Sequence, residues 1–433
     1  MSATRGGSKR GGGSKAGPLL LAALLATLAA HAGVLAAKLA NAPRLPWGPL
    51  LPLGLYAALL AAVWVWLRVT RFAGDPVPLA AALTLTGLGV AVQFRVGTFA
   101  ETGLGSSVVL AYPLGVAAML AMLLFFGGGR ARLLAAAEWP AYAAALAVLV
   151  GMLALGRSYR GGTFLAGNLN PSEIVKPLLV VFLAAFLSGR RAEFSSTQAG
   201  IPMPARGALL ELAVFWAIPM GLVLLLKDIG LFVLLNAVLV LMLYAVARKP
   251  GYLVTGAAAV VLLALAAGLV SAHARARFGA WHAPFEDPTG RSWQVLQALA
   301  ALHSGGLWGA GIGAGAPQTV PIVSSDFIYA ALGEELGFAG CVLLLTVYGV
   351  LFARGWRIAA GAGGPFGQLL GVGLTSALAV QALLNVAGVT KALPLTGITL
   401  PFVSQGGSSL ATSLAMVGLL AALSSRGGGR TRS

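Results

Sequence analysis

Charge is scarce in this chain of 433 residues. Asp, Glu, Lys and Arg make up only 9% of it, whereas 58% of its residues are hydrophobic and the mean hydropathy is +0.88. A soluble protein of this size would need far more charge to cover its surface. The composition therefore excludes a soluble globular protein and indicates a membrane protein.

Cysteine is nearly absent as well. The one cysteine of the sequence, Cys341, lies in an apolar run, so the chain can form neither an intramolecular disulfide nor a cysteine metal cluster. His282 and His303 lack the spacing of a zinc site, and we expect both to be polar loop residues.

Acidic residues are few beside basic ones, and the net charge is +17. In a soluble protein such an excess would suggest binding to nucleic acid. Here the basic residues lie mostly in tails and short loops, which is typical of membrane orientation and contact with anionic lipids. We therefore expect the lipid bilayer, and no nucleic acid, as a partner.

Long apolar runs recur along the whole sequence, each long enough to cross a hydrocarbon core about 30 Å thick. Backbone groups in lipid must be satisfied within the segment, so the runs are predicted to be helices, and the short alternating segments of a barrel are not seen. We predict an all-α polytopic membrane protein with about twelve transmembrane helices, at roughly 18–37, 47–67, 77–93, 106–126, 136–156, 171–187, 207–226, 229–247, 252–271, 326–353, 367–388 and 404–424. Alternatively, the closely spaced pair 207–226 and 229–247 forms one broken or re-entrant element.

The loops predict the orientation. Residues 1–16 read as a disordered basic tail and residues 426–433 as a second basic tail. A signal peptide is rejected, because the first apolar run exceeds the usual length and many spans follow. The basic loop residues fall on one side, which the positive-inside rule makes the cytoplasm: Arg68, Arg71, Arg130, Arg132, Arg190, Arg191, Arg248, Lys249, Arg354 and Arg357. Both termini are then cytoplasmic, and the large loop 272–325 is extracytoplasmic.

Two outward stretches carry ionisable residues next to membrane spans. The first contains Arg157 and Arg160, followed by Glu173 and Lys176, which are three apart and share a helix face. It is either part of a working site or a capped helix with a local ion pair. The second is the Lys227-Asp228 pair, which is either part of the same site or a solvated turn.

The long loop is the richest outward stretch. It carries Asp287, Arg291 and Gln294 beside tryptophans, and then a Gly-rich run at 305–315. Arginine can grip phosphate oxygens bidentately, glycine permits close ligand approach, and aromatic rings suit carbohydrate faces or an interfacial belt.

Two further stretches complete the polar set. Asp326 opens the tenth span, and Glu334 and Glu335 follow inside it, where two adjacent acids cannot both face lipid. The last loop, 393–409, contains Pro394 and Pro401 and is predicted to be a structured, non-helical segment buried in protein or facing a cavity. Its hydroxyl groups, including those of Thr396, Ser404 and Ser408, could satisfy a polar ligand.

Four motifs, in this order, resemble the SEDS family (shape, elongation, division and sporulation proteins of the RodA/FtsW type) over roughly residues 77–425. They are Asn170-Pro-Ser-Glu173 with Lys176, Asp287-Pro-Thr-Gly290 leading to Trp293-Gln294, Gly333-Glu-Glu-Leu-Gly337, and Pro394 to Ser404 with Gly406-Gly-Ser-Ser409. The resemblance implies a ten-helix core, so that residues 17–76 look like two additional N-terminal helices. The sequence departs from the usual motifs at Asn170, at Ser292-Trp293, at Ser324-Ser325 and at Gln405.

The resemblance also implies a function and a place. Such proteins polymerise lipid II, the polyprenyl-linked peptidoglycan precursor, at the outer face of the bacterial cytoplasmic membrane and release polyprenyl diphosphate. They typically work with a class B penicillin-binding protein, a transpeptidase. The essential loop aspartate of the family falls on Asp287.

For this reaction we expect Asp287 to be the general base or the group that orients it. Some subset of the cations Arg157, Arg160, Lys176, Lys227, Arg291 and Lys391 would bind the diphosphate. Further expected substrate-binding residues are Glu173, Asp228, Gln294, Asp326, Thr396, Ser404 and Ser408. No cofactor is specified, although a divalent cation such as Mg²⁺ or Mn²⁺ could share the substrate pyrophosphate.

Two alternatives stay open. A flippase for lipid-linked oligosaccharide would need a hydrophilic path, which Glu211, Glu334 and Glu335 would line. A non-catalytic scaffold for a penicillin-binding protein would tolerate the loss of Asp287.

Overall fold

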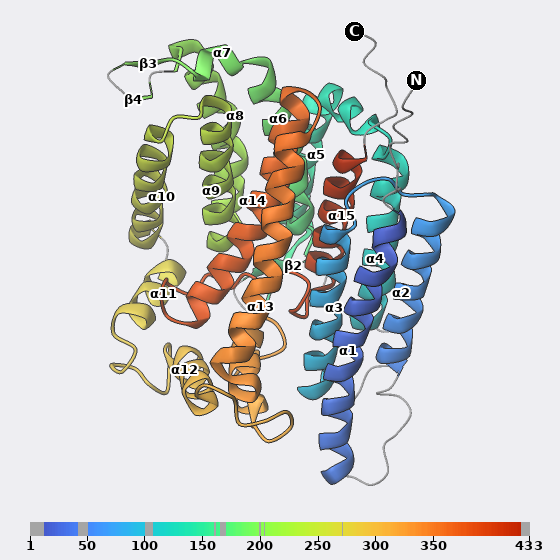
Figure 1. Ribbon diagram of the computed structural model, residues 1–433. Helices are drawn as coiled ribbons and strands as arrows, with labels where there is room; N and C mark the ends of the chain where they lie inside the picture. Colours follow the sequence, from blue (N-terminus) through green and yellow to red (C-terminus); the bar gives the residue numbers. More distant parts are fainter. Residues whose placement is uncertain are drawn as a thin grey trace, which may run out of the picture.

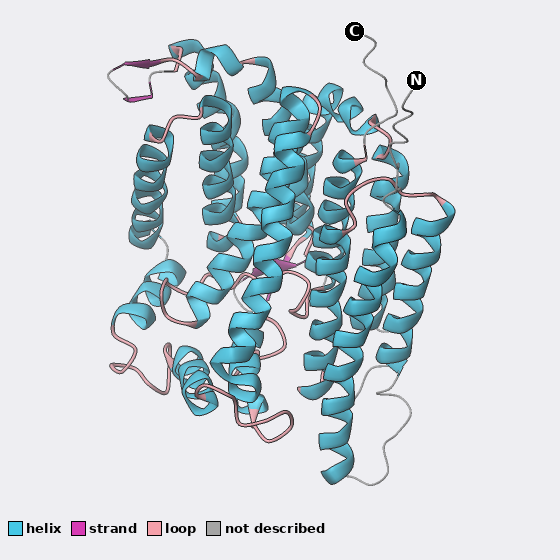
Figure 2. Cartoon of the chain, in the orientation of Figure 1, coloured by secondary structure: helices cyan, strands magenta, loops and turns pink. Residues whose placement is uncertain are grey.

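Helices dominate the structure, as the apolar runs predict (Figure 2). The computed structural model describes residues 13–41, 51–99, 107–159, 162–164, 170–198, 201–202, 204–270 and 272–425. Within that part, ten helices are long and apolar enough to cross a membrane, and Gly54–Val69 and Gly251–Leu263 are shorter apolar helices. The chain is a multi-pass all-α membrane protein, and each of the twelve predicted spans coincides with a helix.

Twelve apolar helices form the bundle in the described part of the chain. They are α1 (Gly13–Asn41), α2 (Leu51–Val69), α3 (Val77–Arg95), α4 (Ser107–Phe126), α5 (Glu138–Leu155), α6 (Ser172–Gly189), α8 (Arg206–Leu225), α9 (Ile229–Ala247), α10 (Gly251–Val270), α13 (Ile328–Gly361), α14 (Gly364–Val389) and α15 (Gly407–Ser424). The start of α1 lies within the predicted basic tail 1–16, whose first twelve residues, like 426–433, lie outside the described residues.

The remaining elements are short. They are the 3₁₀ helices η2 (Arg130–Ala137) and η3 (Pro317–Thr319), the helices α7 (Arg191–Phe194), α11 (Ala272–His282) and α12 (Trp293–Gly305), and the strands β1 (Arg157–Tyr159), β2 (Gly162–Phe164), β3 (Thr197–Gln198) and β4 (Ile201–Pro202). The strands form two small antiparallel hairpins, in which Ser158 is opposite Thr163 and Thr197 is opposite Pro202.

The closely spaced pair of spans forms two helices. Only three residues, Leu226, Lys227 and Asp228, separate α8 from α9, and each helix is long enough to cross a membrane. Figure 1 shows the two helices side by side. The pair therefore forms two spans rather than one re-entrant element.

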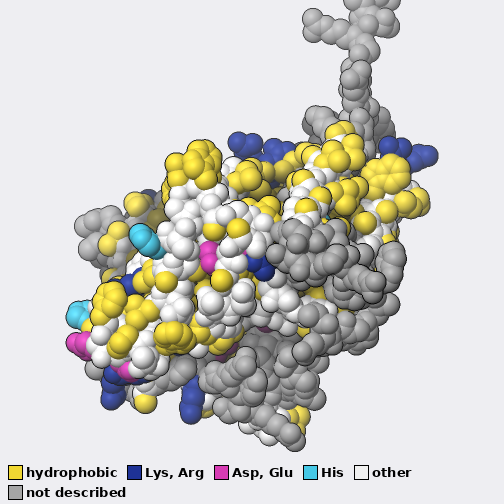
Figure 3. Space-filling model, turned by 90° about the horizontal axis from the view of Figure 1, so that it is seen from below, with side chains coloured by type: hydrophobic (Ala, Val, Ile, Leu, Met, Phe, Trp, Pro, Cys, Tyr) yellow, Lys and Arg dark blue, Asp and Glu magenta, His cyan; other side chains and the backbone are white. Residues whose placement is uncertain are grey.

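The two ends of the bundle differ in their chemistry. Arg68 at the end of α2, Arg190 after α6, Arg248 after α9 and Arg354 late in α13 lie near the helix ends at the top of Figure 1. The helices α11 and α12 lie at the opposite end. Seen from that end, histidine, acidic and basic side chains all appear on the described surface, mostly toward one side (Figure 3). The predicted basic loops therefore share one end, and the long loop occupies the other.

The middle of the bundle is formed by α3, α6, α14 and α15. In these helices 67–78% of the apolar stretch is buried inside the protein, compared with 22% for the stretch that contains α5 and 28% for α1. Polar side chains on the four central helices therefore meet protein rather than lipid, and the candidate site lies among them.

Two irregular segments, 320–327 and 390–406, enter this middle region. Leu400, Phe402 and Val403 are almost fully buried although the backbone around them is not helical. Side-chain donors from neighbouring helices satisfy the backbone carbonyl groups of these segments. Gln93 donates to Ser324 O (2.7 Å) and Val403 O (3.3 Å), Asn385 donates to Asp326 O (2.9 Å) and Ile398 O (2.7 Å), and Tyr348 donates to Pro401 O. The prediction of a structured, non-helical segment is confirmed for residues 393–406, of which 400–404 are buried, whereas residues 407–409 begin α15.

The helix α13 is broken at Gly337, which has φ +67° and ψ −169°. The Gly-rich segment that follows α12 pairs with the backbone on both sides of the break. Its bonds are Ala310 N to Glu334 O (2.8 Å), Gly311 N to Glu335 O (3.1 Å), Phe338 N to Gly306 O (2.9 Å) and Ala339 N to Leu307 O (3.0 Å). A Cβ at Gly337 would lie 2.3 Å from Gly309 N, so both the dihedral angles and the close approach require glycine.

The two acids beside the break lie inside the protein, as predicted. Glu334 and Glu335 are 8% and 7% exposed. Glu335 forms an ion pair with Arg95 Nε (2.6 Å), whose Nη2 donates to Gly315 O (2.8 Å), and Glu334 accepts a hydrogen bond from Ala316 N (2.8 Å). Their contacts hold the Gly-rich segment against α3 and α13.

Candidate active site

The start of α6 supplies the first part of the site. Asn170 Oδ1 accepts hydrogen bonds from the backbone N–H (3.1 Å) and the hydroxyl (2.6 Å) of Ser172, which fixes the entry of the chain into the helix. One turn further on, Glu173 and Lys176 form the ion pair that their spacing predicts. The Lys176 side chain is only 2% exposed. A lysine in this position needs compensation from its neighbours, because a buried charge is costly.

Lys176 also contacts a second helix. Its Nζ donates to Gln381 Oε1 on α14 (2.6 Å), and Gln381 Nε2 donates to Ser409 Oγ (3.1 Å) and Thr399 O (3.1 Å). The hydroxyl groups of Thr399 and Ser409 lie 2.9 Å apart. Lys176 therefore belongs to a network that joins three elements, and a local ion pair alone does not describe it.

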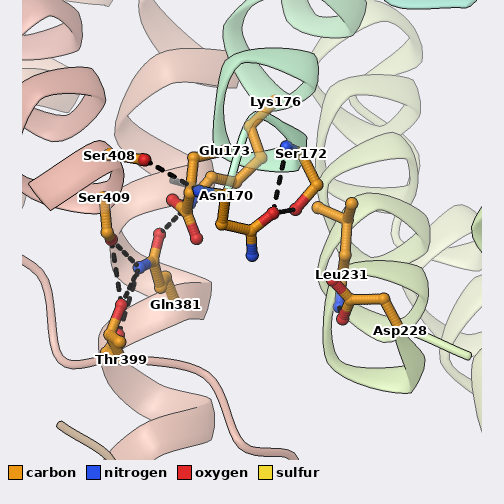
Figure 4. Close-up of polar contacts among 10 residues, drawn as sticks. All are labelled: Asn170, Ser172, Glu173, Lys176, Asp228, Leu231, Gln381, Thr399, Ser408 and Ser409. Carbon is orange, nitrogen blue, oxygen red and sulfur yellow. Dashed lines mark hydrogen bonds and ion pairs between the residues drawn. The ribbon is translucent and has the colours of Figure 1, made fainter. Parts of the chain in front are cut away.

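Asn170 closes this network from the other side, because its backbone N–H donates to Ser408 Oγ (3.0 Å). Figure 4 shows how these side chains converge from α6, α14, the 390–406 segment and the start of α15. We call this group the central cluster. Its members are Asn170, Ser172, Glu173, Lys176, Gln381, Thr399, Ser408 and Ser409.

Part of the central cluster was missed at the level of the sequence. The missed members are Asn170, Ser172, Gln381, Thr399 and Ser409, of which all but Gln381 lie within the motifs quoted above. A signal for Gln381 was present, because Gln381 and Asn385 are four apart in the otherwise apolar α14 and so lie on one helix face. Amide side chains inside a membrane span usually bind protein or ligand.

Two acids, Asp228 and Asp326, lie just before helices, and Arg277 lies in the middle of α11. Asp228 precedes α9 and accepts a hydrogen bond from Leu231 N (2.9 Å). Burial raises the pKa of the Asp228 and Asp326 carboxyl groups, and the positive charge of Arg277 opposes this rise at both. Glu173 and Lys176 also act on Asp228 through their charges. The charges of Asp228 and of these two residues of the central cluster therefore act on one another.

Asp287 is held within its own turn. Its Oδ2 accepts hydrogen bonds from Arg291 N (3.0 Å) and Arg291 Nε (3.2 Å). The backbone N–H of Arg291 is the main cause of a lowered pKa at the Asp287 carboxyl, and the Arg291 side chain adds to it. The group therefore stays ionised at neutral pH.

The geometry of the turn explains why the Asp-Pro-Thr-Gly motif ends in glycine. A Cβ at Gly290 would lie 2.3 Å from Asp287 Oδ1 and 2.6 Å from Oδ2. Any larger residue at position 290 would displace the carboxylate. Glycine thus leaves the space that the aspartate occupies.

The other predicted residues lie in several places. Ser404 Oγ accepts from Leu400 N (2.9 Å) and donates to Ser325 O, which joins the two irregular segments. Lys227 is exposed, Gln294 is half-buried on α12, and Lys391 O accepts from Trp281 Nε1 (3.0 Å). Arg160 lies outside the described residues, and Arg157 is described only as backbone of β1. Within the described ranges, no three His, Cys, Asp or Glu side chains come together to hold a metal ion.

The contacts of Asp287 do not reach the central cluster. In the described part of the chain its polar partners are Arg291 and Gly290. The α11–α12 connection, which contains it, lies at the outer edge of the molecule in Figure 1. The structure brings Glu173, Lys176, Asp228 and Ser408 together and leaves Asp287 and Arg291 on a separate loop at the same end of the bundle.

A family model matches most of the chain. The model for the cell cycle proteins FtsW, RodA and SpoVE matches residues 77–427. Among curated proteins, the peptidoglycan glycosyltransferase RodA of Mycobacterium tuberculosis is 37% identical over 260 residues, which are 59% of this chain and 55% of that protein. Stage V sporulation protein E of Bacillus subtilis is 38% identical over 278 residues, which are 63% of this chain and 72% of that protein. The matches to the mycobacterial proteins thus span little more than half of their length.

Solved structures resemble the chain as well. One, described as a peptidoglycan synthase complex that coordinates polymerization and crosslinking, contains a chain that is 28% identical, with a TM-score of 0.65, and the match covers 82% of this chain and 99% of that one. The rod shape determining protein RodA of Thermus thermophilus is 26% identical, with a TM-score of 0.57, and the match covers 81% of this chain and 96% of that one.

Proposed function

The chain belongs to the FtsW, RodA and SpoVE family of cell cycle proteins, and on that premise we propose that it is a peptidoglycan glycosyltransferase. It polymerises lipid II into glycan strands and releases polyprenyl diphosphate. The observation that carries the proposal is the arrangement at one end of the bundle, where the buried central cluster and the loop with Asp287 lie on the same side. A lipid-linked substrate can enter such a site from the membrane while its glycan reaches the loop from outside.

Asp287 acts as the general base. The acceptor sugar hydroxyl attacks the anomeric carbon of the donor, a C–O bond forms there, and the C–O bond to the diphosphate breaks. The hydroxyl proton passes to Asp287, and the polyprenyl diphosphate leaves as an anion. Arg291 keeps the carboxylate ionised through two bonds to Oδ2.

The cations of the site stabilise the leaving diphosphate. We retain Arg157, Arg160, Lys227, Arg291 and Lys391 as candidates for this role. Lys176 fits it less well, because Glu173 and Gln381 already accept hydrogen bonds from its Nζ. Its role in the proposal is to hold α6 against α14, so that the substrate meets a fixed surface. A divalent cation, if bound with the substrate, would help to neutralise the charge of the leaving diphosphate, and protein carboxylates would hold it.

The acids argue against a flippase. The hydrophilic path of a flippase would be lined by Glu211, Glu334 and Glu335. Glu211 is bound by Arg190 (2.7 Å) near the end of the bundle that carries the basic loops, whereas Glu335 is paired with Arg95 near the opposite end. These side chains stabilise local structure at the two ends and form no continuous path.

The cellular setting follows from the same proposal. The protein lies in the bacterial cytoplasmic membrane, with both termini in the cytoplasm and the loop 272–325 outside. A class B penicillin-binding protein is its transpeptidase partner. The location of the basic helix ends at one end of the bundle supports this orientation.

The test is glycan synthesis from lipid II by the purified protein, with and without a class B penicillin-binding protein. Polymer made by the protein alone, and abolished by Asp287→Asn, would establish the catalytic function. Polymer made only with the partner would show activation, provided that the same substitution abolishes it. No polymer under either condition would contradict the proposal and favour lipid II transport, which proteoliposomes can measure.

A further inference from the structure

Arg277 is a cation of this region that the sequence motifs do not single out. It lies half-buried on α11, and its Nη1 donates to Leu395 O (3.2 Å). A Cβ at Gly397 would lie 2.8 Å from its Nη2, so the guanidinium is seated directly on the irregular segment. One turn further along α11, Trp281 donates to Lys391 O (3.0 Å). The contacts of Arg277 itself with Leu395 and Gly397 fix the position of its guanidinium at the edge of the site.

Arg277 differs from Lys176 in the use of its donors. The Lys176 ammonium is engaged by Glu173 and Gln381. A guanidinium has five N–H donors, and Leu395 O accepts the one hydrogen bond that Arg277 makes within the described ranges. Most of the donors of Arg277 therefore remain available to a ligand.

Two carboxylates act on this arginine through their charges without binding it. Burial lowers the pKa of the Arg277 guanidinium, and the negative charges of Asp326 and Asp228 oppose this lowering. Neither forms an ion pair with it among the described residues. The charge is thus stabilised at a distance, and the planar face of donors that suits phosphate oxygens stays open.

Two unpaired polar atoms lie on elements next to Arg277. Thr396 Oγ1 and Asn385 Oδ1 are buried and have no hydrogen-bond partner in the described part of the chain. Thr396 lies between Leu395 and Gly397, the two residues against which Arg277 is seated, and Asn385, 2% exposed, donates to Ile398 O (2.7 Å). Buried polar atoms are normally paired, so these atoms point to a ligand that offers both acceptors and donors.

We propose that Arg277 binds the diphosphate of the polyprenyl-linked substrate, with Thr396 donating to the same anion. A sugar hydroxyl next to the diphosphate would donate to Asn385 Oδ1. The inference rests on the proposed function, since that function supplies the diphosphate. It adds to the site an arginine that lies outside the recognised motifs.

The test measures binding of geranylgeranyl diphosphate to the full chain in nanodiscs of zwitterionic lipid, by isothermal titration. Arg277→Gln removes the charge and is expected to weaken binding about tenfold or more, as for the loss of hydrogen bonds to a charged group. Arg277→Lys keeps the charge but lacks the planar guanidinium, so its affinity should lie between those of the unmodified protein and Arg277→Gln. The melting temperature of each variant shows that the fold is kept, and the lysine variant serves if Arg277→Gln does not fold.

Two matched controls separate charge from structure. Trp281→Phe removes the other α11 donor to the irregular segment and leaves Arg277 in place. Arg357→Gln removes one positive charge at the opposite end of the bundle. Both should bind the probe as the unmodified protein does. Equal losses in Trp281→Phe and Arg277→Gln would show that α11 only clamps the segment, and would overturn the proposal.

The remaining outcomes are also decisive. Normal binding by Arg277→Gln would overturn the proposal, and so would competition by phosphatidylglycerol that matches the diphosphate, because the site would then bind a lipid headgroup. If the unmodified protein makes no glycan from lipid II but binds the diphosphate through Arg277, the proposed reaction is wrong and the anion site stands.

Discussion

The central cluster and the Asp287 loop are built in opposite ways. In the cluster, Lys176 is 2% exposed and contacts side chains on two helices, and the amide of Gln381 extends the network to Thr399 and Ser409. In the loop, the Asp287 side chain is 36% exposed and its hydrogen bonds go to a residue four positions away. One region depends on the whole bundle, and the other depends on a single turn.

This difference separates stability from chemistry. A substitution in the central cluster leaves a buried polar group without its partner, and this lowers the stability of the fold. A change at Asp287 leaves the protein interior untouched, and its effect is expected in the reaction alone. Functional side chains often lie on loops that a rigid scaffold positions, and here the scaffold and the loop can be tested separately.

The largest effect is expected for Asp287→Asn. The substitution keeps the shape of the side chain and removes the base, so glycan synthesis from lipid II should fall by about 10²–10⁴-fold. The melting temperature should stay as it is, because the hydrogen bonds of Asp287 are local and exposed. Polymerisation close to that of the unmodified protein would remove Asp287 from the catalytic role.

The second prediction concerns Lys176→Met. It leaves Glu173 without its partner and Gln381 without its donor, and should lower the free energy of unfolding by about 3–5 kcal/mol. Chemical unfolding in detergent, followed by circular dichroism, measures the loss.

The matched control is the double variant Glu173→Gln with Lys176→Met. Because it removes the unpaired charge, it should be more stable than Lys176→Met alone. Equal stability of the single and double variants would mean that the unpaired charge of Glu173 is not the cause of the loss in Lys176→Met.

A smaller effect on activity is expected for Gly290→Ala. The added methyl group would lie 2.3 Å from Asp287 Oδ1, so the carboxylate has to move while its charge remains. Displacement of a catalytic group by about 1 Å can cost about 10²-fold, and the loss of glycan synthesis should therefore stay below that of Asp287→Asn. A loss as large as that of Asp287→Asn would indicate that the loop itself has collapsed, which proteolysis of the 272–325 region would reveal.

The sequence predicted the scaffold better than it predicted the site. A long apolar run in lipid must form a helix to satisfy its backbone hydrogen bonds. The spans, including the separate α8 and α9, could therefore be recognised from hydropathy. The ion pair of Glu173 and Lys176 followed from their spacing on a helix. Both are local properties of the chain.

The partners across the bundle could not be read in the same way. Lys176 and Gln381 are 205 positions apart, and Gln93 and Val403 are 310 apart, so only the packing of the helices reveals these contacts. Gln381 and Asn385 are polar residues in an apolar helix, a signal that was not used. Both also donate to backbone carbonyl groups, which carry no sequence signal. The break at Gly337 could not be predicted either, because the Gly-rich segment that pairs with the backbone beside it comes from another part of the sequence.

The smallest effect is expected in the pH dependence of Arg291→Gln. The Arg291 backbone N–H, followed by its side chain, lowers the pKa of Asp287 below the ordinary value of 3.8. The carboxylate therefore stays ionised as the pH falls, until the lowered pKa is reached. The substitution removes the guanidinium but leaves the backbone N–H, so the pKa should rise only part of the way towards 3.8.

The measurement is the rate of glycan synthesis against pH for both proteins. With each profile scaled to its own rate at neutral pH, the acid limb of Arg291→Gln should lie at higher pH than that of the unmodified protein. Asp228 and Asp326 titrate in both proteins, so the difference between the two profiles isolates Asp287. An acid limb that stays in place would show that the local turn does not set the ionisation of Asp287, and that the loop depends on the bundle after all.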